Sequence, residues 1–184
     1  MSNVRFVLVT SVLCVAISTG FVRLVPVVHT IRNKLNDKFA NANSTIHQEG
    51  KEQRNQSLDW EIEVKREIRD LRVTVTYYIV SSDGTTQNAL ISRSVELCAF
   101  LRRPTMDRFL KNFYVHMQFE SILPARCPIK QGHYAIRNVR PSDISIPGFL
   151  PESDFILEVA WNQKARNEPL AQSRTFGKLI RVVD

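Results

Sequence analysis

Cysteine and histidine are the side chains with the widest chemistry in this 184-residue chain. The cysteines are Cys14, Cys98 and Cys127, and the histidines are His29, His47, His116 and His133. They are scattered and show none of the short, regular spacings at which zinc ligands occur. We therefore expect no metal site.

Sequence motifs of catalysis are absent. The chain contains no G-x-S-x-G nucleophile elbow, no phosphate-binding Walker loop, no dinucleotide fingerprint and no H-E-x-x-H zinc motif. Glu61 and Glu63 alternate with apolar residues, a spacing that solvates one face of a strand rather than pairing an acid with a base. We expect a protein that is not an enzyme and that needs no cofactor.

The first twenty residues have the three parts of a secretory signal peptide. A short start with one positive charge, Arg5, precedes an apolar run at residues 6–17, and small residues follow. We expect residues 1–20 to direct secretion into an extracellular compartment. The alternative is a short uncleaved membrane anchor, because two more apolar residues precede Arg23. Even so, the run stays below the roughly 20 residues that span a bilayer.

Removal of this leader would take Cys14 with it and leave Cys98 and Cys127. An even pair of cysteines in an oxidising compartment predicts a disulfide. A crosslink over a loop of this length stabilises a fold by about 3–4 kcal/mol through the entropy of the unfolded chain. Two unpaired, buried thiols are the alternative.

Two N-x-[ST] sequons, which begin at Asn43 and Asn55, fit the same compartment. Both lie in a polar stretch, so we expect N-linked glycans there. The alternative is a polar loop without glycans.

The composition indicates a single globular domain, with 43% hydrophobic and 23% charged residues. The formal net charge of +7 raises the question of a nucleic-acid partner. Acidic residues interrupt the basic ones, however, and no recognition motif is present. We therefore expect no nucleic-acid partner.

Residues 21–57 form a polar N-terminal segment. Val27, Ile31, Leu35 and Phe39 are four residues apart, which favours a short amphipathic helix. We expect the rest of this segment, residues 41–57, to be flexible.

Residues 58–184 show the patterns of a β-rich domain. Alternation of apolar and polar residues predicts strands at residues 58–64, 71–79, 86–97, 133–139, 155–161 and 176–183. Asp83-Gly84 marks a hairpin turn, and we expect polar turns at residues 162–173. Short strands separated by turn signals indicate an all-β, antiparallel sandwich.

One amphipathic helix interrupts the strands. Residues 104–119 place large apolar side chains at helical spacing, and Thr105 is the expected N-cap. Its apolar stripe either fills the core or lines a ligand site.

Residues 88–161 carry a distinctive pattern of cysteine, aromatic and glycine residues. It includes C-x-F-L at Cys98 and C-P-x-x-x-G-x-Y at Cys127. This pattern resembles the insect family called domain of unknown function 1091 (DUF1091). That family is grouped near the ML lipid-recognition domains, whose relatives include the CheB chemosensory proteins and the ganglioside activator.

The resemblance implies a secreted, immunoglobulin-like (ML-type) sandwich with an apolar space between its sheets and no enzymatic activity. The implied ligands are lipids or lipid-like semiochemicals, and Cys98 and Cys127 match the characteristic cysteines of the family. The side chains expected to line the space are Phe109, Phe113, Met117, Phe155, Leu157 and Trp161.

Two functions therefore compete. The first is an extracellular carrier or presenter of a small hydrophobic ligand. The second is a secreted module with a filled core that docks on a receptor through an exposed patch, for which the irregular loop at residues 141–151 is the candidate.

Overall fold

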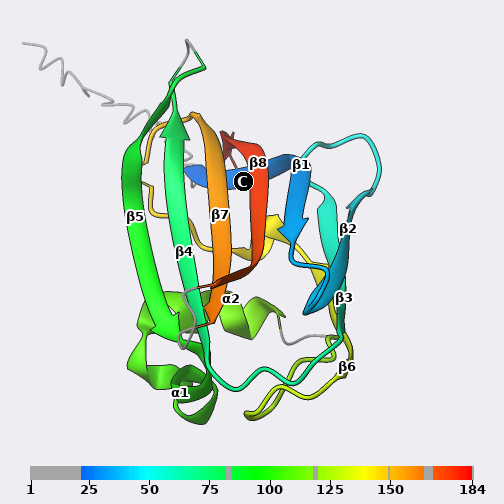
Figure 1. The fold of residues 1–184 in the computed structure, drawn as a ribbon. Coiled ribbons are helices and arrows are strands. Elements are labelled where there is room, and N and C mark those ends of the chain that lie inside the picture. Colours follow the sequence, from blue (N-terminus) through cyan, green and yellow to red (C-terminus); the bar gives the residue numbers. More distant parts are fainter. Residues whose placement is uncertain (1–21, 82–83, 118–119, 149, 164–167, 184) are drawn as a thin grey trace, which may run out of the picture.

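The computed structural model describes residues 22–81, 84–117, 120–148, 150–163 and 168–183. The predicted signal peptide lies outside these residues. The described chain forms two antiparallel sheets with two helices at one end (Figure 1). The prediction of an all-β sandwich is confirmed.

The strands are β1 (Val22–Leu35), β2 (Ala40–Gln48), β3 (Gln56–Val64), β4 (Leu71–Val80), β5 (Thr86–Glu96), β6 (Gly132–Val139), β7 (Asp154–Gln163) and β8 (Glu168–Val183). The helices are α1 (Leu97–Arg102) and α2 (Arg108–Met117), with single 3-10 turns at Pro104–Met106 and Pro141–Asp143. No helix of the described residues is both long enough and apolar enough to cross a bilayer.

The two sheets differ in width. The larger one has the strand order β1-β8-β7-β4-β5, and the smaller one has the order β2-β3-β6. The central strands β4 and β7 pair with each other from Leu71–Gln163 to Val80–Asp154. Three strands cannot cover the whole inner face of a five-stranded sheet, so helices and loops must cover the rest of it.

The β4–β5 hairpin confirms the prediction at Asp83-Gly84. Gly84 has a positive φ of 80°, which glycine adopts without a steric cost. Across the turn, the Ser81 amide donates a hydrogen bond to the Thr85 carbonyl at 3.0 Å. Asp83 itself lies outside the described residues.

The predicted helix around Val27 and Ile31 is wrong, because these residues lie in β1. A spacing of four residues fits one face of a helix, but it also fits one face of a strand, whose period is two. Pairing with β8 from Val22–Val183 to Leu35–Ala171 decides between them. The sandwich therefore begins with β1 rather than at residue 58.

Most of the stretch expected to be flexible at residues 41–57 is strand, apart from the turn at residues 49–55. It forms most of β2 and the start of β3, which pair from Ala40–Val64 to Gln48–Gln56. Asn43 is exposed on β2, and Asn55 is exposed at the turn before β3. Polar residues are tolerated here because β2 is an edge strand with one face in water.

Two smaller boundaries differ from the predictions. β7 continues to Gln163 and β8 begins at Glu168, so all the described residues of the polar turn region expected at residues 162–173 are strand. α2 is confirmed, but Thr105 does not cap it. The carboxylate of Asp107 accepts a hydrogen bond from the Leu110 amide at 3.0 Å and satisfies one free amide of the first turn.

A buried glutamine ties the two sheets together. The Gln56 side chain of β3 accepts a hydrogen bond from the Val28 amide at 2.8 Å and donates one to the Val28 carbonyl at 3.0 Å. The pairing of β1 with β8 shifts register between Val28 and Thr30. Gln56 therefore satisfies backbone groups at the irregular point of β1.

Candidate functional site

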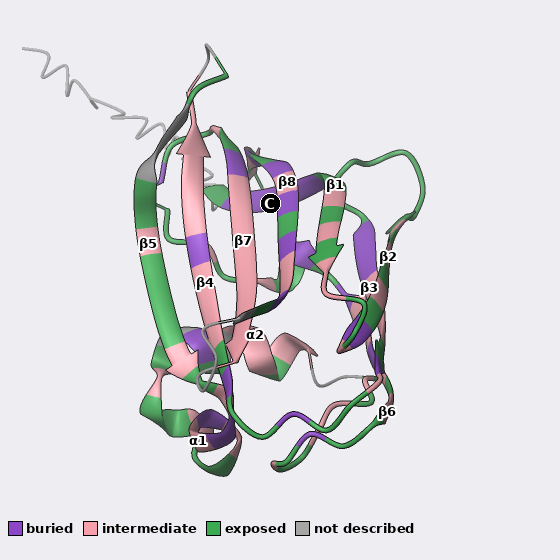
Figure 2. Cartoon of the chain, in the orientation of Figure 1, coloured by how far each residue is buried: buried purple, intermediate pink, exposed green. Residues whose placement is uncertain are grey.

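The inner face of the larger sheet is the side that faces the smaller sheet. On this face, neighbouring apolar side chains of β4 and β7 lie opposite one another in the register. Those of β4 are Leu71, Val73, Val75, Tyr77 and Ile79, and those of β7 are Phe155, Leu157, Val159 and Trp161. The two strands lie in the middle of their sheet. Even so, Figure 2 shows most of β4 and β7 as only intermediate in burial. Large apolar side chains are thus incompletely covered on this face.

The described core is divided. One cluster surrounds Leu71 and Ile129 near the helices, a second surrounds Phe155 and Leu179, and a third surrounds Leu58 on the smaller sheet. A filled domain usually has one contiguous core. Val75 and Val159 are register partners at the middle of the sheet. They are half-buried and belong to none of these three clusters of described residues.

Tyr77 lies two residues from Val75 on the same face of β4. Its ring stacks on Phe155 with centroids 5.6 Å apart and 20° between the planes. Its hydroxyl oxygen is buried and has no hydrogen-bond partner in the described structure. Burial raises the pKa of Tyr77 to about 12, because the phenolate is poorly solvated there. At neutral pH the side chain is a neutral hydrogen-bond donor inside an apolar environment.

Polar groups occur at two other places on the inner face. Ser173 and Thr175 of β8, opposite Val159 and Leu157, are buried. Arg93 of the edge strand β5, opposite Val75, is exposed. The face is therefore an apolar strip with hydroxyls along one side and a cation at its edge.

The predicted ligand-lining residues do not form a single group. Phe155 and Leu157 belong to the cluster that contains Tyr77, whereas Trp161 packs near Leu71. Met117 of α2 packs against the cluster around Leu58. Phe113 is half-buried on α2, and the side chain of Phe109 lies outside the described part of the structure.

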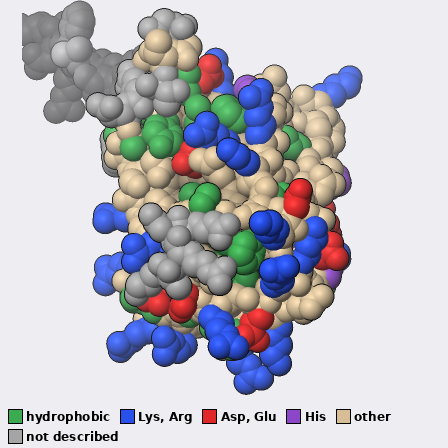
Figure 3. Space-filling model, viewed as in Figure 1, with side chains coloured by type: hydrophobic (Ala, Val, Ile, Leu, Met, Phe, Trp, Pro, Cys, Tyr) green, Lys and Arg blue, Asp and Glu red, His purple; other side chains and the backbone are tan. Residues whose placement is uncertain are grey.

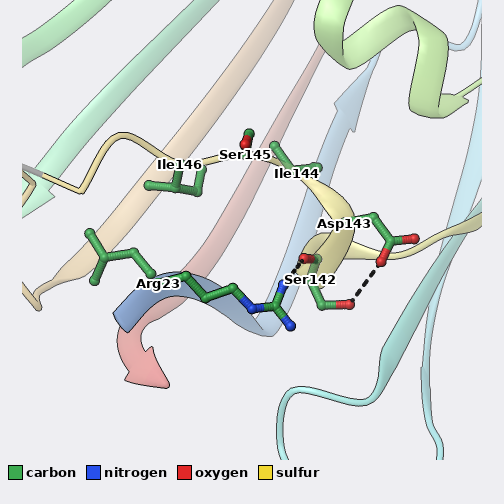
Figure 4. A pocket seen from close by; sticks show the side chains of 7 residues that line it. Arg23, Ser142, Asp143, Ile144, Ser145 and Ile146 are labelled. Atoms are coloured by element: carbon green, nitrogen blue, oxygen red, sulfur yellow. Dashed lines mark hydrogen bonds between the residues drawn. The ribbon is translucent and has the colours of Figure 1, made fainter. Parts of the chain in front are cut away.

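A shallow hollow opens at the other side of the Tyr77 cluster. Arg23 and Leu24 of β1 form one wall, and residues 142–146 form the other (Figure 4). The Arg23 guanidinium donates a hydrogen bond to the Ser142 carbonyl at 3.0 Å across it. Leu24 and Ile146 also pack into the cluster around Phe155. Leu24 and Ile146 therefore belong both to the lining of the hollow and to the cluster that contains Tyr77.

The loop at residues 141–151 turns apolar side chains inward. Leu150 is buried, and Ile146 packs against the same cluster as Tyr77. Pro147 and Gly148 are exposed. The loop thus covers part of the inner face, while Asp143, Ser145 and Pro151 are exposed as well.

The predicted disulfide joins Cys98 of α1 to Cys127, with the Cα atoms 5.5 Å apart. It holds α1 next to the segment that contains Cys127 and Ile129, and Ile129 in turn forms an antiparallel bridge with Ile68. The disulfide and this bridge together hold three chain segments at one end of the sandwich.

This end is rich in positive charge. Figure 3 shows Lys and Arg side chains gathered at the lower end of the molecule, near the helices. The disulfide and the Ile68–Ile129 bridge bring together five exposed cations that form no ion pair with a carboxylate of the described residues, and we call them the basic end: Arg66, Arg102, Arg103, Arg126 and Lys130. Met106 lies next to them and is 58% exposed.

Sequence reasoning did not single out Tyr77, Gln56 or Gly177. Tyr77 could have been found, because it is the one residue with a polar tip in the inward phase of Leu71, Val73, Val75, Tyr77 and Ile79. Gln56 and Gly177 carry no local signal, since Gln56 bonds to Val28 of β1 and Gly177 lies directly against Val27 and Phe155, all of them far away in the chain.

Residues 73–157 match the sequence model of a family described as "Protein of unknown function (DUF1091)". The match runs from β4 through the helices and β6 into β7, and it includes both disulfide cysteines and Tyr77. This confirms the resemblance to that family, whereas the relationship to ML proteins stays a prediction. No curated protein matches the chain.

Proposed function

We propose that the protein binds a small, largely apolar molecule against the inner face of its larger sheet and catalyses no reaction. The region that matches DUF1091 and the two-sheet sandwich are the setting of this proposal. The observation that carries this proposal is the half-buried apolar strip of the two central strands, with Val75 and Val159 outside the described core clusters. Apolar side chains at the centre of a sheet gain free energy when a ligand covers them, at roughly 25 cal/mol per Å².

Two features support an extracellular setting for this function. The Cys98–Cys127 disulfide is of a kind that persists in oxidising compartments. Asn43 and Asn55 of the two sequons are both exposed, as acceptors of N-linked glycans must be. We propose that the ligand is bound outside the cell, where a small apolar molecule needs a carrier or a presenter.

The test uses the full chain, secreted from eukaryotic cells and purified without detergent. Mass spectrometry of an organic extract reports any molecule that co-purifies. Titration with the neutral fluorescent probe N-phenyl-1-naphthylamine reports binding to the emptied protein. We expect an extractable apolar compound, saturable probe binding and displacement of the probe by the extract.

Val75→Trp is the informative variant, because an indole at this position would occupy the proposed site. We expect it to abolish probe binding while the far-UV circular dichroism and the unfolding midpoint stay near the wild-type values. The control is Val115→Trp on the exposed face of α2, which should bind the probe normally. A clean extract with no probe binding would refute the proposal, as would a Val75→Trp protein that no longer folds because its core was already full.

A second candidate function is docking of an acidic protein on the basic end. Five cations without carboxylate partners among the described residues, beside the exposed Met106, favour it. Poly-L-glutamate immobilised on a column is the probe. We expect retention that falls with salt and is lost when Arg102, Arg103 and Lys130 are changed to Glu.

The control for that experiment changes Lys34, Lys51 and Lys178 to Glu, which gives the same net charge at exposed positions outside the basic end. It should reduce retention only slightly. Equal losses from both triple variants would mean that net charge alone causes retention, and the basic end would not be a specific surface.

A further inference from the structure

The hydroxyl of Tyr77 is a polar group whose burial the fold does not explain. Its oxygen is buried with no hydrogen-bond partner in the described structure. A buried hydroxyl without a partner destabilises a protein, and native structures contain few of them. The neighbouring Tyr78 points to the other side of the same strand, which shows that β4 can place a tyrosine where water reaches it.

The surroundings of Tyr77 restrict what could pair with it. Phe155 stacks on its ring, and Leu157 is opposite it on β7. Ile91 is opposite it on β5, and Leu150 belongs to the same cluster. These side chains offer no hydrogen-bond acceptor, so an acceptor must come from a bound molecule or from water.

The partner must also be uncharged. A carboxylate in this apolar cluster would be costly to desolvate and would need a buried cation. The inward cation of the neighbouring strand, Arg93, lies at the exposed edge of the sheet beside Val75 rather than in the Tyr77 cluster. A ketone, aldehyde or ester oxygen accepts a hydrogen bond from a phenol without that cost.

We propose that the ligand is a neutral, chain-like molecule with one carbonyl-type oxygen, which accepts a hydrogen bond from the Tyr77 hydroxyl while its hydrocarbon part lies along Val75 and Val159. This assignment rests on the proposed function and adds the chemical class of the ligand. Tyr77 supplies the selectivity, and the apolar strip supplies most of the affinity.

The experiment compares three ligands with equal numbers of heavy chain atoms: a long-chain methyl ketone, the corresponding alkane and the corresponding fatty acid. Each displaces N-phenyl-1-naphthylamine from the wild-type protein and from Tyr77→Phe. We expect the ketone to bind the wild type most tightly. Removal of the hydroxyl should weaken ketone binding by about tenfold and leave alkane binding unchanged.

Tyr78→Phe is the matched control, since it removes the same atom from the opposite face of β4. It should bind all three ligands like the wild type. A second readout tests whether the Tyr77 hydroxyl is merely structural. The ligand-free Tyr77→Phe protein should unfold at the same or a higher denaturant concentration than the wild type, because the variant loses an unpaired polar group.

The outcomes separate the two proposals. Failure of all three ligands and of the probe to bind the wild type would remove the proposed function, and the assignment of the ligand class with it. Ketone binding that is equal in the wild type and in Tyr77→Phe would overturn only the ligand class. Tighter binding of the fatty acid, unaffected by Tyr77→Phe, would also overturn it and would move the polar contact to Arg93.

Discussion

Tyr77, Phe155 and Gly177 lie in a row, in which the Tyr77 ring stacks on Phe155 and the Phe155 ring lies against the backbone of Gly177. Phe155 stacks under the Tyr77 ring, and a Cβ atom on Gly177 would lie 2.7 Å from Cζ of Phe155 and in still closer contact with the Val27 carbonyl oxygen. Gly177 is therefore required by a close approach and not by its backbone angles. At the residue scale, the absence of a side chain at this position of β8 leaves room for the Phe155 ring on which the Tyr77 ring stacks.

Gly177→Ala should destabilise the protein by about 1–3 kcal/mol, because the added methyl group meets both a ring and a backbone oxygen. Urea unfolding followed by circular dichroism measures the change. Gly148→Ala is the control, since a Cβ there meets nothing within 4 Å. Equal midpoints for the two variants would show that Phe155 and β1 move aside freely.

Tyr77 should make the stability depend on alkaline pH. Its folded-state pKa of about 12 is above the ordinary value of 10.0, so the fold favours the neutral hydroxyl. This contribution is fully present below pH 10 and is lost as the pH rises toward 12. Urea unfolding across this range should show a smaller loss for Tyr77→Phe than for the wild type. Parallel losses in both proteins would contradict the assigned burial.

At the scale of elements, β1 illustrates what the sequence could and could not predict. The spacing of Val27, Ile31 and Leu35 is compatible with either a helix or a strand, and the choice falls to pairing with β8, which lies more than a hundred residues away in the chain. Strands with clear alternation, such as β4 and β7, were predictable because each already matches one apolar face. Gln56 was not predictable, since its two partners belong to β1.

Gln56→Leu should lower the free energy of unfolding by about 2–4 kcal/mol, because it leaves the amide and the carbonyl of Val28 buried without partners. The same unfolding assay measures this, with the exposed Gln53→Leu as the control. A Gln56→Leu protein as stable as the control would mean that water replaces the side chain and that the tie between the sheets contributes little.

At the scale of the whole molecule, the order of strands follows from contacts that no local pattern contains. The sequence indicated two antiparallel layers, one helix and one disulfide. It did not indicate that β8 lies between β1 and β7, or that one sheet is wider than the other. That difference in width is also why four of the six predicted lining residues are spread over three clusters, since α2, the loops and the smaller sheet each cover a different part of the inner face.

The region that matches the family should not fold by itself. Residues 73–157 lack β8, the partner of β7 in the larger sheet, and they leave β6 alone from the smaller sheet. A polypeptide of these residues should show no cooperative thermal transition, whereas residues 22–184 should show one. Cooperative unfolding of the shorter polypeptide would mean that the remaining strands close the sandwich without β1, β2, β3 and β8.

Methyl NMR of valine-labelled protein tests the central claim most directly, because it reports where an apolar molecule binds. On titration with the long-chain methyl ketone, the methyl signals of Val75 and Val159 should shift in a saturable manner. The signals of Val115 and Val183, which are 42% and 69% exposed, should stay in place. Saturable shifts confined to the exposed valines, or no shift at Val75 and Val159, would contradict binding on the inner face.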